Sequence, residues 1–349
     1  MRTKNMATIS LDPRFNPQVG KNQHQHGGVV EEIDGLIRVY KDGHVERPSI
    51  VPIVPCTMSL ERGVTANDVV IDKCTSLWAR IYVPSCFGKL PFLVYFHGGG
   101  FCVGSAAWSC YNEFLSNLAS KANCVIISVN YRLAPENRLP AAYEDGFNTL
   151  MWVKQQALNG STEHRWWLRH CNLTSMFLAG DSAGANIAYN VATRLGSSGT
   201  SDFTIIRPLY LKGTILIQPF FGGEARTWSE KYTNQPANSA LSLLVSDKYW
   251  HLSLPIGSNR DNPWCNPLAN GMAKLRDFRL PNIMVCVSET DILKDRNLEF
   301  CTALTNAGKR VETVMYKGVG HSFQILHNSQ LSQPRTQEMM SHIKAFINE

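Results

Sequence analysis

The chain has 349 residues, of which 44% are hydrophobic and 18% are charged, and it contains 34 Lys and Arg residues against 28 Asp and Glu residues. This composition excludes a disordered chain, which would be poor in apolar residues and rich in charge. The net charge of +6 is small for this length and no run of Lys and Arg exceeds two residues, so nucleic acid is not expected as a partner.

The N-terminal residues carry no visible targeting signal. Residues 1–22 lack the apolar core of a secretory signal peptide, and no stretch approaches the roughly 18 apolar residues of a membrane helix. We therefore expect a cytoplasmic protein that does not insert into membranes. The ten Cys residues follow neither Cys-x-x-Cys nor Cys/His ligand spacing, so we expect no structural zinc site and no disulfides. Cys124 and Cys286 lie in apolar runs and are expected to be buried free thiols.

Short apolar runs alternate with helical patterns along the chain. Runs rich in β-branched and aromatic residues predict buried strands at 77–83, 92–96, 124–129, 176–179, 213–217, 283–287 and 311–316. Helical spacing of apolar residues, together with the intervals between the strands, predicts helices at 111–118, 143–151, 183–195, 295–307 and 337–347. This alternation implies an α/β fold, in which one mostly parallel sheet is covered by helices on both faces.

Two segments depart from this alternation. Residues 1–50 contain only a short β-like piece at 36–40, and residues 222–262 are polar with a helical stretch at 241–252. Such segments in α/β proteins often lie above the carboxyl ends of the strands, where ligands bind. We therefore expect a small cap made of residues 1–50 and of 222–262, the second being inserted in a catalytic domain that spans residues 51–349. The alternative is a loose tail and an ordinary surface excursion.

A glycine-rich sequence, His97-Gly-Gly-Gly-Phe101, follows the strand predicted at 92–96. Consecutive glycines let the backbone approach a ligand closely, and their N–H groups can stabilise a developing oxyanion together with the N–H of Ala183. A hinge or a phosphate loop is the alternative, but the GxxxxGK[ST] pattern of a phosphate loop is absent. His97 itself is expected to hold the loop rather than to carry protons.

The sequence Gly180-Asp-Ser-Ala-Gly184 lies between the strand predicted at 176–179 and the helix predicted at 183–195. In this context G-x-S-x-G is typical of a nucleophile elbow, a tight turn in which small residues flank a serine whose hydroxyl projects from the sheet. The pattern therefore predicts Ser182 as a nucleophile.

A serine nucleophile needs a base, and the base needs an orienting acid. The strand predicted at 283–287 leads into Asp291, and the strand predicted at 311–316 leads into His321. Both side chains should therefore lie at the same edge of the sheet as Ser182, and the order Ser, Asp, His along the chain is that of an α/β hydrolase.

Three neighbouring residues are alternatives or supports for these roles. His327 is the rival base, and Glu289 is the rival acid. Asp295 is interpreted as a helix N-cap or as a support behind the site.

These motifs together resemble those of the hormone-sensitive-lipase-like group of α/β hydrolases, and most closely those of plant carboxylesterases. The resemblance is carried by His97-Gly-Gly-Gly-Phe101, Asn130-Tyr-Arg-Leu-Ala-Pro-Glu136, Leu139-Pro-Ala-Ala142, Gly180-Asp-Ser-Ala-Gly184, Asp291-Ile-Leu-Lys-Asp295 and His321-Ser-Phe323. It runs from about residue 30 to the C-terminus. It implies Ser182 as nucleophile, His321 as base and Asp291 as its partner. It also implies an oxyanion hole of Gly99, Gly100 and Ala183, and a cap over the site.

The resemblance implies a serine carboxylesterase that acts on esters of small, apolar or acylated metabolites without a metal or an organic cofactor. Non-hydrolytic relatives are the alternative. Gibberellin receptors resemble the family but typically have Ser at the third glycine and lack the catalytic His, so Gly100 and His321 disfavour that function. Dehydratases and cyclases use the same scaffold, some with Thr as nucleophile; Ser182 disfavours the Thr type and leaves a cyclase open.

Aromatic residues near strand ends or in the expected cap are the predicted substrate-binding residues: Phe101, Trp108, Tyr131, Phe220, Phe221 and Trp250. Bulky aromatic side chains suit an apolar acyl or alcohol group better than a charged one, so the expected partner is a small-molecule ester. For each of them, packing in the core is the alternative. Both a monomer and a homodimer remain open.

Overall fold

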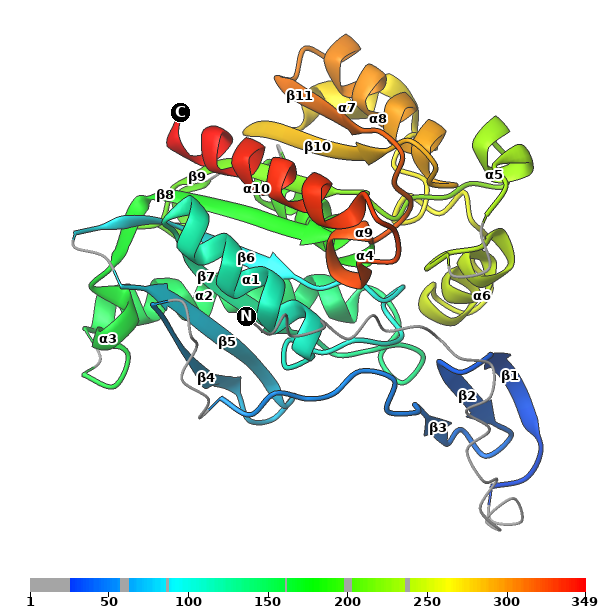
Figure 1. Cartoon of the computed structure of the whole chain (residues 1–349), viewed down its shortest axis with the longest axis horizontal. Helices are drawn as coiled ribbons and strands as arrows, with labels where there is room; N and C mark the ends of the chain where they lie inside the picture. The colour runs from blue at the N-terminus through cyan, green and yellow to red at the C-terminus, as the bar shows by residue number, and fades with distance from the viewer. Residues whose placement is uncertain (1–25, 57–62, 86–87, 161, 198–202, 236–238) are drawn as a thin grey trace, which may run out of the picture.

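The computed structural model describes residues 26–56, 63–85, 88–160, 162–197, 203–235 and 239–349. In this part of the chain an eight-stranded sheet has the order β11-β10-β9-β8-β6-β7-β5-β4 (Figure 1). Its strands are β4 (Val64–Asp72), β5 (Leu77–Pro84), β6 (Leu90–Phe96), β7 (Val125–Asn130), β8 (Cys171–Asp181), β9 (Leu211–Ile217), β10 (Asn282–Ser288) and β11 (Val311–Tyr316). In this spatial order, each pair of neighbours from β11 through β6 to β7 is parallel. Strand β5 runs antiparallel to both β7 and β4. The predicted mostly parallel sheet is confirmed.

Helices cover both faces of this sheet. Helices α1 (Ser109–Ala122) and α10 (Ser332–Asn348) pack together on one face, which is turned to the viewer in Figure 1. Helices α2 (Ala141–Asn159), α4 (Ala183–Leu195) and α8 (Lys294–Asn306) contribute to the core on the other face.

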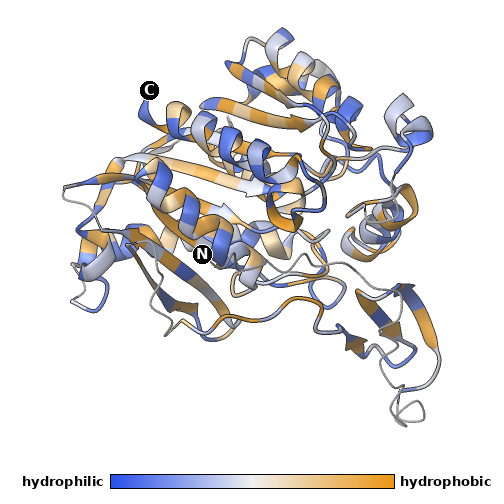
Figure 2. Cartoon of the chain, viewed as in Figure 1, coloured by the Kyte–Doolittle hydropathy of each residue, from blue (hydrophilic) through white to orange (hydrophobic). Residues whose placement is uncertain are grey.

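Strand β6 shows why the central runs are apolar throughout. Phe92, Val94 and Phe96 belong to one core cluster, and Leu93 and Tyr95 belong to the other. Successive side chains of a strand point to opposite faces, so a strand covered on both faces must be apolar at every position. Figure 2 shows the same contrast, since the central strands are mostly orange whereas α1 and α10 alternate between orange and blue.

The structure adds elements that the sequence patterns did not predict. They are β1 (Val29–Ile33), β3 (Val45–Glu46), β4, α3 (Arg165–Leu168), the 3₁₀ helix Phe203–Ile206, α5 (Trp228–Tyr232), α7 (Gly271–Asp277) and α9 (Phe323–Leu326). Most are too short for periodicity to reveal. Strand β4 is long, but it lies at the edge of the sheet and only Val64 and Val69 are buried, so it has no continuous apolar run.

The two segments expected to form a cap lie side by side. Strands β1, β2 (Ile37–Tyr40) and β3 form a small antiparallel sheet, and the later segment contains α5 and α6 (Leu243–Ser253). The Lys248 ammonium on α6 donates to the carbonyl oxygen of Glu32, and His251 lies 3.5 Å from the Glu31 carboxylate. In Figure 1 these elements lie on the side to which the parallel strands point. The boundaries of a separate cap and a catalytic domain stay a prediction.

The described helices include none that is both long and apolar enough to cross a membrane. Among the same residues, no three His, Cys, Asp or Glu side chains are grouped as metal ligands would be. Cys124 and Cys286 are fully buried free thiols, as predicted.

Candidate active site

Ser182 occupies a sharp turn between β8 and α4. Its φ of 53° and ψ of −119° lie in a region that residues with a side chain rarely adopt. The turn is possible because the residues at 180 and 184 have no Cβ. A Cβ at Gly184 would overlap the carbonyl oxygen of Phe96, and a Cβ at Gly180 would overlap the backbone of Gly184. Only glycine fits at both positions. The chain therefore forms the tight strand–turn–helix geometry of the predicted elbow, and close packing of the neighbouring glycines keeps Ser182 in its strained backbone conformation.

The structure brings Ser182, His321 and Asp291 together. His321 Nε2 lies 2.9 Å from Ser182 Oγ, and His321 Nδ1 lies 2.7 Å from Asp291 Oδ2. All three side chains are buried, with exposed fractions of 5%, 4% and 1% respectively. Asp291 follows β10 and His321 follows β11, so the carboxyl ends of neighbouring parallel strands place them next to the elbow.

The alternative acid and base lie elsewhere. His327 is exposed at the end of α9, and Glu289 is exposed with its carboxylate accepting a bond from the Gly318 N–H at 2.9 Å. The interpretation of Asp295 as a helix N-cap is wrong, because α8 begins at Lys294 and its N-cap is Leu293. The Asp295 carboxylate instead accepts a 2.6 Å bond from the Ser229 N–H, so it fastens α5 of the inserted segment to α8.

Gln218 is a residue of this site that the sequence patterns missed. It directly follows β9, is fully buried and has a φ of 47°. Its Oε1 accepts a 2.7 Å bond from the Ser322 N–H, and its Nε2 donates to Ser288 Oγ at 2.6 Å. Gln218 thereby ties the His321 loop to the ends of β9 and β10. Its position immediately after a buried strand is the signal that could have identified it.

The glycine loop after β6 forms a tight turn beside the elbow. Gly99 and Gly100 have φ values of 111° and 57°. A Cβ at Gly99 would overlap the carbonyl of Val103, and a Cβ at Gly100 would overlap the ring of Tyr249 on α6. In the described part of the chain, the N–H groups of Gly99, Gly100 and Ala183 donate to no other residue, so they remain free to bind a ligand oxygen.

His97 is a buried side chain that contacts the backbone of this loop. It is fully buried, its Nδ1 lies 2.8 Å from the carbonyl oxygen of Gly98, and its ring stacks on Tyr131 at 4.3 Å. Burial lowers the pKa of His97 to about 4, so the ring is neutral at pH 7. The Tyr131 hydroxyl donates to the carbonyl oxygen of His97 at 2.8 Å. These contacts agree with the predicted structural role of His97.

Asp181, the residue before the nucleophile, connects the elbow to the glycine loop. It is fully buried and accepts bonds from the Tyr95 hydroxyl at 2.8 Å, the Tyr111 hydroxyl at 3.0 Å and the Gly98 N–H at 3.1 Å. Burial raises the pKa of Asp181 to about 6, although the two tyrosine hydroxyls favour its charged form. This network depends on three distant segments, and the sequence patterns did not reveal it.

Replacing Asp181 by Asn is expected to change how stability depends on pH. The folded pKa of about 6 lies above the usual 3.8, so the wild type loses stability as pH rises from about 4 through 6. This difference corresponds to about 3 kcal/mol in the free energy of unfolding. Asn cannot ionise, so urea unfolding from pH 4 to 7 should show the variant gaining about this amount relative to wild type. Parallel pH profiles would contradict the prediction, and the exposed Asp277→Asn serves as the control.

The aromatic residues predicted to bind substrate are mostly buried beside the site. Phe101, Tyr131, Phe220, Phe221 and Trp250 are at most 2% exposed. Trp108 is half-buried at the N-cap of α1. Their contact with a substrate stays a prediction, because each of the five buried rings is also a packing residue of the core.

This aromatic cluster is joined to the nucleophile through the backbone. Trp250 stacks on Phe220 at 4.6 Å, and its ring lies 5.5 Å from that of Phe101. The N–H of Phe220 donates to the carbonyl oxygen of Ser182 at 3.0 Å. The cluster therefore lies immediately next to the elbow.

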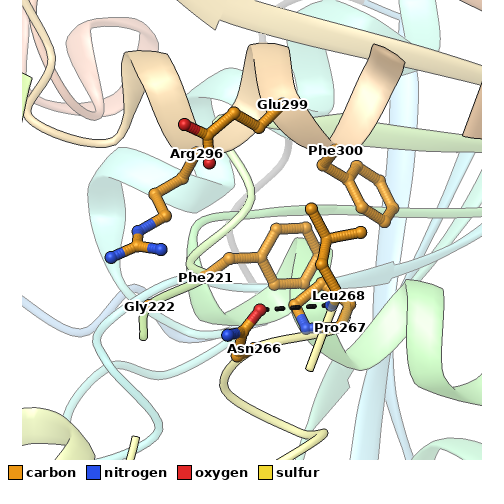
Figure 3. Close-up of a pocket in the computed structure, with 8 residues that line it drawn as sticks. All are labelled: Phe221, Gly222, Asn266, Pro267, Leu268, Arg296, Glu299 and Phe300. Carbon is orange, nitrogen blue, oxygen red and sulfur yellow. Dashed lines mark hydrogen bonds between the residues drawn. The ribbon is translucent and has the colours of Figure 1, made fainter. Parts of the chain in front are cut away.

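A cavity of about 140 Å³ opens between α8, the residues that follow β9, and residues 266–268 (Figure 3). Its wall includes Phe221, Leu268, Phe300 and Arg296, but no member of the Ser182, His321, Asp291 group. The Arg296 guanidinium already forms two bonds with the Glu230 carboxylate, at 2.9 and 3.0 Å. Its charge is thereby neutralised, so this cavity offers no free cation to a ligand.

Comparisons with known proteins agree with this architecture. A family model described as the alpha/beta hydrolase fold matches residues 93–325. The chain is 49% identical over 332 residues to the probable carboxylesterase 6 of Arabidopsis thaliana, covering 94% of each chain. It is 35% identical over 328 residues to a 2-hydroxyisoflavanone dehydratase of Glycyrrhiza echinata, covering 90% of this chain and 95% of that one. A solved esterase of Pyrobaculum calidifontis superposes with a TM-score of 0.67 at 26% identity, covering 85% of each chain.

Proposed function

The chain belongs to the α/β-hydrolase-fold family, and on that premise we propose that it is a serine carboxylesterase that hydrolyses esters of small molecules through an acyl-enzyme on Ser182. The observation that carries this proposal is the continuous hydrogen-bond chain from Ser182 Oγ through His321 to Asp291. A hydroxyl, an imidazole and a carboxylate joined in this order can activate the hydroxyl for attack on a carbonyl carbon.

In the first half of the reaction, Ser182 Oγ attacks the ester carbonyl carbon. His321 Nε2, 2.9 Å away, accepts the hydroxyl proton. The Asp291 carboxylate accepts a hydrogen bond from His321 Nδ1 and stabilises the imidazolium that forms. His321 then protonates the leaving alkoxide, so the alcohol departs and the acyl group stays on Ser182.

The carbonyl oxygen becomes negatively charged in the tetrahedral intermediate. The free N–H groups of Gly99, Gly100 and Ala183 are the donors assigned to this oxyanion. Because they are fixed by the turn and by the start of α4, they need no reorganisation when the charge develops, and one such donor typically contributes about 10²–10³ in rate.

In the second half, a water molecule repeats the sequence. His321 accepts a proton from water as the water oxygen attacks the acyl carbon, and it then returns the proton to Ser182 Oγ as the acid leaves. Every proton is thus carried by His321, and the oxygen added to the acid comes from water.

The surroundings of the elbow favour an apolar acyl or alcohol group. The ring of Tyr249 lies against Gly100 of the glycine loop, and the backbone N–H of Phe220 donates to the carbonyl oxygen of Ser182, so aromatic residues adjoin both the loop and the elbow. The proposed substrates are therefore small, uncharged esters, which a pocket of mainly apolar lining binds best.

The test is hydrolysis of p-nitrophenyl acetate and butyrate, together with labelling by a serine-reactive phosphonate. We expect turnover, one adduct per chain mapped by peptide mass spectrometry to Ser182, and one ¹⁸O atom in the acid product when the reaction runs in H₂¹⁸O. Absence of both turnover and adduct would overturn the proposal. An adduct at Ser182 without ester hydrolysis, combined with loss of water from a hydroxylated substrate, would favour the dehydratase activity after which the Glycyrrhiza relative is named.

A further inference from the structure

Arg47 links the N-terminal segment to the glycine loop of the active site. It follows β3 and is 24% exposed. Its Nε donates to the carbonyl oxygen of Cys102 at 2.6 Å, and its Nη2 donates to the carbonyl oxygen of Ala134 at 2.8 Å. Both Nη atoms also bind the Glu136 carboxylate, at 2.6 and 2.7 Å. One guanidinium thus joins three segments that are distant in the sequence.

The Cys102 carbonyl belongs to the turn that positions the proposed oxyanion donors. The Cys102 N–H donates to the carbonyl oxygen of Gly99 at 3.0 Å, so the same residue is bound to Arg47 on one side and to Gly99 on the other. Glycines have wide backbone freedom, so a loop that contains several of them needs contacts from outside to keep its N–H groups in one direction. Arg47 supplies such a contact two residues from Gly100.

The inserted segment holds the same loop from another side. The Ser253 hydroxyl on α6 lies 3.1 Å from the carbonyl oxygen of Gly100 and 2.6 Å from that of Tyr249, so its single proton is shared between these two acceptors, and the ring of Tyr249 lies against Gly100. Lys248 joins α6 to the carbonyl oxygen of Glu32 in the N-terminal sheet. Both segments around the site therefore contact the glycine loop through its backbone.

We propose that Arg47 is a positioning residue for ester hydrolysis, which orients the Gly99 and Gly100 N–H groups by holding the carbonyl oxygen of Cys102. The inference rests on the proposed esterase function. Arg47 acts through the loop backbone. Without its guanidinium, the carbonyl oxygens of two buried residues, Cys102 and Ala134, would lose their hydrogen-bond donor. Through this residue the N-terminal segment takes part in transition-state stabilisation without touching the substrate.

The expected effect follows from the geometry of the loop. A displacement of about 1 Å in a catalytic group can cost about 10²-fold in rate. We therefore expect Arg47→Met to lower kcat for p-nitrophenyl acetate by roughly 10- to 100-fold with KM changed less than about threefold, because the loop donors bind the transition state more strongly than the ground state.

The matched control is Arg38→Met. Arg38 lies on β2, its guanidinium binds the carboxylates of Glu32 and Glu46, and within the described part of the chain it forms no hydrogen bond to the glycine loop, so its loss should leave kcat and KM unchanged. Two further measurements separate positioning from general loss of stability. Phosphonylation of Ser182, which also forms an oxyanion, should slow in Arg47→Met in proportion to kcat. Amide hydrogen exchange should accelerate in a peptide covering residues 97–104 and stay unchanged in peptides from α10.

Arg47→Lys keeps the positive charge but cannot bind three acceptors through a planar fork, so it should show the same direction of change with a smaller loss. It replaces Arg47→Met as the test if that variant does not fold. Unchanged kcat and unchanged exchange at residues 97–104, or an equal loss in Arg38→Met, overturn the inference. If the wild type hydrolyses no ester, the proposed function fails, whereas the hydrogen-exchange comparison still decides whether Arg47 orders the loop.

Discussion

Replacing Ser182 by Ala is expected to lower kcat/KM for p-nitrophenyl butyrate by roughly 10⁴- to 10⁶-fold, the range seen when a serine nucleophile is removed from a triad. The reason is local. His321 Nε2 has Ser182 Oγ as its partner at 2.9 Å, and no other described hydroxyl is bonded to that nitrogen. Without this oxygen no acyl-enzyme can form, and only the oxyanion donors remain to assist direct attack by water.

The same substitution should leave the fold nearly unchanged. The backbone of Ser182 is held by its N–H bond to the carbonyl oxygen of Ile217 at 2.8 Å and by the bond from the Phe220 N–H, neither of which involves the side chain. Alanine at a φ of 53° is strained like serine, so the turn costs both residues a similar free energy. The lost hydroxyl bond amounts to about 1 kcal/mol.

The measurement combines steady-state kinetics with thermal unfolding by circular dichroism. Ser341→Ala, an exposed serine on α10, is the matched control and should keep full activity. Residual turnover within tenfold of wild type, in a variant free of wild-type contamination, would show that Ser182 is not the nucleophile.

The parts of the fold that the sequence predicts are those with a repeated pattern. Strands such as β6 and β10 are buried on both faces, so their apolar runs stand out. The first half of β8, Cys171–Ser175, is less apolar and was not predicted, although it pairs with β6 at Cys171. Strand β4 was missed for the same reason, because its polar positions face solvent at the sheet edge.

The candidate site residues that could be predicted lie in the loops that follow predicted strands. Ser182 directly follows β8, Asp291 comes three residues after the end of β10, and His321 comes five residues after the end of β11. Arg47 could not be predicted in this way, since it lies 55 residues before Cys102 and its role depends on how the N-terminal segment packs. The Asp181 network likewise requires Tyr111 on α1 to reach the elbow, which no local pattern can specify.

The pattern also identified aromatic residues without showing their surroundings. Phe101 and Trp250 were predicted because large rings near strand ends suit a pocket, yet both are almost fully buried. Burial depends on which elements pack over a ring, here α6 and the loop after β9, so residue type alone cannot distinguish a pocket wall from a packed core.

Replacing Asp291 by Asn is expected to lower kcat/KM by about 10⁴-fold, the loss that follows when the acid of a triad becomes an amide. The two carboxylate oxygens of Asp291 have different partners. Oδ1 accepts a 3.0 Å bond from the Leu293 N–H, and Oδ2 lies 2.7 Å from His321 Nδ1. Both partners must donate to a carboxylate that has no proton of its own.

An amide has only one oxygen to offer these two donors. If the Asn oxygen keeps the Leu293 N–H, its NH₂ group faces His321 Nδ1 and can only donate to it. The imidazole then carries its proton on Nε2, which points at Ser182 Oγ and cannot accept the hydroxyl proton. The reverse orientation leaves the buried Leu293 N–H facing an NH₂ group, which costs about 1–3 kcal/mol. The loss therefore arises from the wrong tautomer rather than from misplacement of His321.

Glu289→Gln is the control that separates the two acids near the end of β10. The Glu289 carboxylate is exposed, and its hydrogen-bond partner among the described residues is the Gly318 N–H, from which an amide oxygen can still accept. The kcat/KM of Glu289→Gln should therefore stay within about threefold of wild type. Kinetics of both variants are compared with the rate of phosphonylation of Ser182, which needs the same proton transfer and should fall in parallel with kcat/KM for Asp291→Asn. A larger loss of kcat/KM in Glu289→Gln than in Asp291→Asn would assign the orienting role to Glu289. An Asp291→Asn enzyme with wild-type kcat/KM would mean that His321 keeps its tautomer without the carboxylate.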